Sequence, residues 1–159
     1  MLNERVKAQA GQSIEARFQL RDETLKKALE DIAVRVRRDG TGEERNRLGV
    51  QLRLICERDM FDRANLVWEA IYKAHQDLDG TRRPHIKSAM LREIDAHMRV
   101  AALALAAQLK EYSAEFKPAF RGNSAINAEW VARLRQRAAD QQRQKVENYV
   151  AQLKRGLLR

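Results

Sequence analysis

Glycine and proline are scarce in this sequence, with only seven glycines and two prolines among its 159 residues. A fold made of many short strands needs frequent turns, and these two residues provide most of the special backbone angles that turns require. So few breaks favour long helices. The apolar content of 44% and the charged content of 33% suit helices with one buried and one solvated face, and argue against a disordered chain.

Cysteine and long apolar runs are also rare. Cys56 is the only cysteine, so no intramolecular disulfide can form, and we expect a reducing compartment, the cytoplasm. The most apolar run, residues 100–109, is too short to cross a bilayer, which takes about 20 residues. The first residues, MLNER, lack the apolar core of a signal peptide. We therefore predict a protein without a membrane span.

The sequence lacks the motifs of common catalytic sites. It has no glycine-rich phosphate loop, and none of its serines lies in a Gly-x-Ser-x-Gly context. Cys56 lies beside an apolar stripe, where a free cysteine usually packs as a small apolar residue. We predict that the protein is not an enzyme and binds no cofactor.

A metal site is the next alternative, because Glu93, Asp95 and His97 lie close together. Carboxylate-bridged sites in helical bundles use Glu-x-x-His pairs on two helices and further carboxylates on the others. Here the spacing is Glu93-x-x-x-His97 and there is no second pair, so we predict no metal site. His97 is expected to be a core or boundary histidine.

Apolar residues recur at helical spacing from the start of the chain to residue 38. Val6, Ala10, Ile14 and Phe18 are four residues apart, which predicts one face of a long helix over 2–38. Residues 13–21 also alternate between apolar and polar, which alone would predict a strand. We prefer the helix, with a break or kink at Gly11 or near Arg21.

The second helical segment, 43–78, has two apolar stripes that are out of phase. The first contains Leu48 and Leu52, and the second runs from Ala64 to Leu78, about 120° away around the helix. This predicts a kink or break near 57–60, where Asp59 would cap a new helix. Two short antiparallel helices over 48–75 would resemble a single tetratricopeptide-type hairpin, which leaves a helical-repeat adaptor as an alternative fold.

Two more helical segments follow, over 84–117 and 127–155. Pro84 suits a first helical turn, and Asn127 is placed to cap the last helix, with Ile126 and Val131 forming a staple across it. Within the third segment, residues 100–109 are apolar on every side, so we expect other helices to surround them.

These patterns predict one all-α domain over residues 1–159. The fold is an elongated up-and-down bundle of four long helical arms, at about 2–38, 43–78, 84–117 and 127–155. Short loops near residues 40, 80 and 120 join the arms, which makes consecutive arms antiparallel. Residues 1–12 and 156–159 are expected to fray.

Positive charge is concentrated at the end of the chain. The net charge is +9, and residues 118–159 alone carry nine basic and three acidic side chains. Such a balance is typical of a protein with an acidic partner, nucleic acid included, and also of an ordinary solvated helix. The candidate anion or nucleic-acid contacts are Arg82, Arg83, Lys87, Arg133, Arg137, Arg143 and Arg155.

Three functional classes remain. The preferred one is a non-catalytic interaction protein, an adaptor or regulator that binds a partner protein or itself, with Phe61 and Phe120 as candidate contact aromatics. The second is a nucleic-acid-binding protein that uses the basic last helix. The third is an enzyme whose site the sequence does not reveal.

Overall fold

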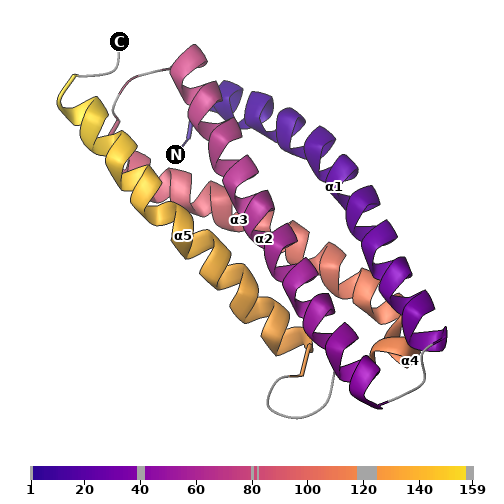
Figure 1. Ribbon diagram of the computed structural model, residues 1–159. Coiled ribbons are helices and arrows are strands. Elements are labelled where there is room, and N and C mark those ends of the chain that lie inside the picture. Colours follow the sequence, from indigo (N-terminus) through magenta and orange to yellow (C-terminus); the bar gives the residue numbers. More distant parts are fainter. Residues whose placement is uncertain (1, 39–41, 80, 82, 118–124, 157–159) are drawn as a thin grey trace.

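The computed structural model describes residues 2–38, 42–79, 81, 83–117 and 125–156. They form five helices and no strand: α1 (Glu4–Arg38), α2 (Gly42–Leu78), α3 (Ile86–Glu111), α4 (Ser113–Phe116) and α5 (Ala128–Lys154). The four long helices run side by side in an elongated bundle (Figure 1). The prediction of an all-α bundle is confirmed.

The first arm is a single unbroken helix. Residues 13–21 belong to α1, so the strand alternative is wrong, and neither Gly11 nor Arg21 interrupts the helix. Ile14 and Phe18 are buried whereas Leu20, which the alternating pattern would place with them, is 66% exposed. Burial therefore follows the helical period. Residues 4–12 are helical with Val6 and Ala10 in the core, and the fraying of residues 1–12 and 156–159 stays a prediction.

The second arm is also one continuous helix, so the break, the cap at Asp59 and the two-helix hairpin are wrong. The two stripes arise because α2 packs against α1 on one side and against α3 and α5 on another. Leu48 and Leu52 of the first stripe lie beside Ile32 and Val36 of α1. Val67 and Ile71 of the second stripe are also buried. The change of phase reflects a change of neighbours.

The third arm is shorter than predicted and is divided in two. Pro84 lies in a turn, His85 has a left-handed backbone (φ 63°), and α3 begins only at Ile86. Tyr112, with φ −109° and ψ 28°, separates α3 from the single turn of α4. The last arm begins as predicted, because the Asn127 side chain accepts a hydrogen bond from the Trp130 N–H at 2.9 Å.

Cross-helix contacts establish the arrangement of the bundle. Ion pairs join Arg21 of α1 to Asp59 of α2, and Asp95 of α3 to Arg135 of α5. α2 contacts α1, α3 and α5, and it has the most buried side chains of the five helices. α1 packs closely on α2 and only sparsely on α3. Consequently α2, and not the third arm, is the central helix.

The apolar run at residues 100–109 is covered on one side only. Ala101, Leu105 and Leu109 are buried, but Val100 is 59% exposed and Leu103 is 74% exposed. The expectation that other helices surround this run is wrong, because the described helices leave its outer face without a neighbour. The fold thus presents two large apolar side chains to solvent in the middle of α3.

Candidate functional site

A groove of about 510 Å³ lies between α1 and α3, directly beside the exposed part of α3. α1 contributes Ile14 and Phe18, and α3 contributes Val100, Ala101 and Ala104. The space exists because α1 and α3 touch sparsely and because α3 carries two small residues, Ala101 and Ala104, on this side. Gly11 lines the same groove, and a Cβ added there would meet nothing within 4 Å.

The floor of the groove is formed in part by an arginine that is almost completely buried. Arg63 of α2 is 2% exposed and donates from Nε to the Asp59 carboxylate at 2.8 Å. Its Nη2 lies 2.7 Å from a carboxylate oxygen of Asp22 on α1. The guanidinium also lies over the Phe18 ring, 4.9 Å from the ring centroid, which is suitable for a cation–π contact. Arg63 therefore holds a groove-lining aromatic in place.

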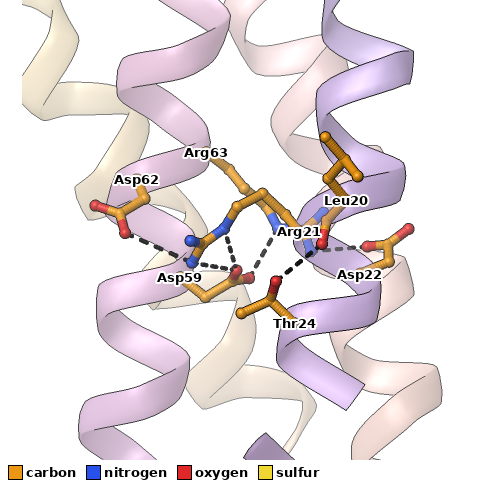
Figure 2. Close-up of polar contacts among 7 residues, drawn as sticks. All are labelled: Leu20, Arg21, Asp22, Thr24, Asp59, Asp62 and Arg63. Carbon is orange, nitrogen blue, oxygen red and sulfur yellow. Dashed lines mark hydrogen bonds and ion pairs between the residues drawn. The ribbon is translucent and has the colours of Figure 1, made fainter. Parts of the chain in front are cut away.

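A second arginine completes the cluster, which we call the α1–α2 ion cluster: Arg21, Asp22, Asp59, Asp62 and Arg63. Arg21 donates from Nε and Nη2 to one Asp59 oxygen at 3.1 and 2.8 Å, as Figure 2 shows. Its Nη2 also lies 3.5 Å from Asp62. Two cations thus face three carboxylates, so the cluster offers no unmatched positive charge to an anionic ligand. Its geometry suits a structural tie between two helices.

The sequence contains a local signal for this cluster, which the prediction of a helix cap at Asp59 overlooked. Asp59 and Arg63 are four residues apart, and both interrupt the buried series that contains Cys56, Met60 and Ala64. An acid and a base with this spacing on the apolar face of a helix predict a buried ion pair. Their partners on α1 are 38 or more residues away, and no local pattern connects them.

His97 lines the same groove but has no metal-site geometry. Its Nε2 lies 3.3 Å from a Glu93 carboxylate oxygen, one turn earlier on α3. Both side chains are partly buried. Among the described residues, no three metal-ligating side chains form a group that could hold an ion.

Cys56 is fully buried, and burial together with nearby Asp59 raises the pKa of its thiol to about 12. A nucleophilic cysteine needs the thiolate, which a raised pKa disfavours. Cys56 therefore acts as a packing residue.

A second buried polar contact joins α2 to α5. His75 Nδ1 and the Tyr149 hydroxyl are 2.5 Å apart, in a cluster of aromatic rings with Trp68 and Tyr72. Burial is the main cause that lowers the pKa of His75, and it also raises the pKa of Tyr149 to about 12. Both groups are therefore neutral near pH 7. Because both are buried, this pair is a packing feature of the core.

Most of the predicted anion contacts are already paired within the molecule. Arg83 pairs with Asp79 at 3.2 Å and Lys87 with Glu147 at 2.9 Å. On α5, Arg133 pairs with Glu129 at 3.0 Å and Arg137 with Glu57 at 3.6 Å. Arg143 and Arg155 are exposed and have no ion pair among the described residues, whereas Arg82 lies outside them. The structure therefore does not bring these residues together as one free basic surface.

Of the two predicted contact aromatics, the structure describes only Phe61, which is not an exposed anchor. Phe61 is partly buried and packs against the core, and Phe120 lies outside the described residues. Among the described residues, the large apolar side chains that are exposed are Leu20, Val50, Leu54, Val100 and Leu103. Sequence reasoning missed Val100 and Leu103 because it assigned them to the core.

Comparisons with protein-family models, curated proteins and solved structures find no match to this chain. None of the helices that the structure describes has an apolar stretch sufficient to span a bilayer. The groove and the exposed face of α3 are therefore the features that point to a function.

Proposed function

We propose that the protein is a non-catalytic interaction module that binds another polypeptide through the outer face of α3 and the groove beside it. The observation that supports this proposal is the exposure of Val100 and Leu103, at 59% and 74%, next to an open groove. Exposed apolar residues that gather beside a groove are typical of protein-binding surfaces. A cytoplasmic setting, in which an unpaired cysteine persists, is consistent with this proposal.

An amphipathic helix is the kind of segment that this surface suits. Apolar side chains of such a helix can enter a groove between two helices, with contacts repeated every three or four residues. Ala96 and Ala107 lie on the same outer face of α3, and their small side chains allow a second helix backbone to approach closely. Complete burial of a leucine side chain contributes about 1.5–3 kcal/mol, so Leu103 would be a major contact.

The test compares two glutamate substitutions at exposed leucines. Leu103→Glu places a charge on the proposed surface, and Leu20→Glu places one at a similarly exposed position, 66% against 74%, on another helix. Tagged wild-type and variant proteins are each incubated with a lysate of the native cells. The polypeptides that they capture, other copies of this chain included, are identified by mass spectrometry. The proposal requires capture that Leu103→Glu abolishes and Leu20→Glu retains. Equal capture by the two variants would contradict it.

A further inference from the structure

Four exposed residues on α3 form a continuous line, which we call the α3 stripe: Ala96, Val100, Leu103 and Ala107. Their spacing of four, three and four residues is that of the seam between two paired helices. All four are exposed in the structure, although the opposite side of α3 is buried against the bundle. The α3 stripe is therefore a seam that lacks a second helix.

Each end of the α3 stripe carries one cation and one anion. Arg92 and Glu93 precede the stripe, and Lys110 and Glu111 follow it. At about 100° per residue around the helix axis, Arg92 and Lys110 lie about 50° to one side of the α3 stripe. Glu93 and Glu111 lie about 50° to the other side. Arg92, Lys110 and Glu111 are exposed and make no ion pair among the described residues, whereas Glu93 lies 3.3 Å from His97.

This charge pattern distinguishes the two ways in which α3 could pair with itself. If the helices are parallel, a two-fold axis along the seam places Arg92 beside the partner's Glu93 and Lys110 beside the partner's Glu111. If they are antiparallel, Arg92 faces the partner's Lys110 and Glu93 faces the partner's Glu111. The parallel arrangement joins opposite charges at both ends, and the antiparallel arrangement joins like charges.

We infer that a second copy of this chain occupies the α3 face, with the two α3 helices parallel. The inference rests on the proposed function and names the partner. A two-fold interface uses the same patch on both subunits, so the patch must complement itself. The α3 stripe does so, because Val100 and Leu103 each meet their own counterpart at the centre, and small Ala96 and Ala107 bring the backbones together. The charged residues at each end of the α3 stripe then pair with those of the second copy, so no other molecule is needed to neutralise them.

The expected affinity is modest. The α3 stripe spans four seam layers, which is about 17 Å at 1.5 Å per residue. Stable dimers usually bury more surface than one short seam provides. We therefore expect a dissociation constant in roughly the micromolar range, so that the protein is dimeric at high concentration and dissociates on dilution.

Sedimentation velocity of the intact protein from about 1 to 300 µM tests the dimer. Wild-type and Leu20→Glu proteins should dimerise with the same dissociation constant, and Leu103→Glu should stay monomeric. All three should show the same helical content by circular dichroism. A wild-type monomer over the whole range would overturn the inference. If capture of other polypeptides still depended on Leu103, the proposed function would nevertheless stand. A dimer that survives Leu103→Glu would overturn the choice of surface.

The parallel orientation has its own test. Lys110→Glu should weaken the parallel dimer about threefold to tenfold, because the new glutamate meets the partner's Glu111. The double variant Lys110→Glu/Glu111→Lys should restore it. In an antiparallel dimer Lys110→Glu would instead meet the partner's Arg92, and tighter association would overturn the parallel model.

Oxidative cross-linking provides an independent measurement. Ala96→Cys alone should form a covalent dimer under oxidation. Cross-links only in a mixture of Ala96→Cys and Ala107→Cys would also overturn the parallel model.

Discussion

Removal of the Asp59 carboxylate should destabilise the protein more than most single substitutions. Asp59 is 3% exposed and accepts hydrogen bonds from both Arg21 and Arg63. In Asp59→Ala, Arg63 stays buried with only Asp22, whose side chain is 41% exposed, as a counter-charge. Loss of one partner from a buried ion pair typically costs about 3–5 kcal/mol, because it leaves the other charge poorly compensated. We expect the free energy of unfolding of Asp59→Ala to fall by an amount within this range.

Urea denaturation followed by circular dichroism at pH 7 measures this loss. Asp62→Ala is the matched control, because Asp62 is 48% exposed and lies 3.5 Å from Arg21, and exposed pairs contribute about 0–1 kcal/mol. Replacement of both buried partners, as in Asp59→Leu/Arg63→Met, should recover most of the lost stability, since no buried charge is left uncompensated on α2. A cost below about 1 kcal/mol for Asp59→Ala would refute the view that the cluster ties α1 to α2.

Three further predictions concern the core and the charges. Leu105→Asp, at a side chain 1% exposed, should cost several kcal/mol or prevent folding; an unchanged melting temperature would show that α3 is packed differently. Burial lowers the pKa of His75 from 6.5, so the unfolded chain binds the proton more tightly, and stability should fall as the pH drops below about 6.5. His75→Gln should lose less stability than the wild type between about pH 7.5 and 5.5 in urea titrations. Equal losses would argue against His75 as the source of this pH dependence. The net charge of +9 predicts weak binding to single-stranded DNA that fades between about 50 and 200 mM salt. If Arg143 and Arg155 contact phosphates, alanine at each should reduce the salt slope measured by fluorescence anisotropy by about 0.7, and an unchanged slope would exclude them.

Much of the fold could be predicted from the sequence because helices here begin and end at chemically distinct residues. Asn127 caps α5 as its position predicted, and Gly156 follows the end of that helix with a positive φ of 68°. The four-residue spacing of Val6, Ala10 and Ile14 correctly outweighed the short alternation over 13–21. These features are local, so a single sequence contains them.

The errors concern which neighbours each helix has. The phase change in α2 was interpreted as a break, but it reflects a helix with α1 on one side and α5 on another. The run around Leu103 was assigned to the core, because an alanine- and leucine-rich helix looks the same in sequence whether or not every side is covered. The open side depends on how sparsely α1 packs on α3, which is a tertiary property.

The α1–α2 ion cluster was missed for the same reason. Arg63 and Asp59 carry a local signal, but their partners Arg21 and Asp22 lie on another helix. Among the predicted basic contacts, Arg133 and Arg137 pair with acids on the same or a neighbouring helix, Glu129 and Glu57. Charge counts along the chain do not reveal such pairing.

The central claim, that the outer face of α3 is an interaction surface that a second copy of the chain occupies, is tested most directly by sedimentation velocity of the wild-type and Leu103→Glu proteins over the same concentration series. The account predicts a wild-type dimer that dissociates on dilution and a Leu103→Glu protein that is folded and monomeric throughout. Identical sedimentation of the two proteins at every concentration would contradict it.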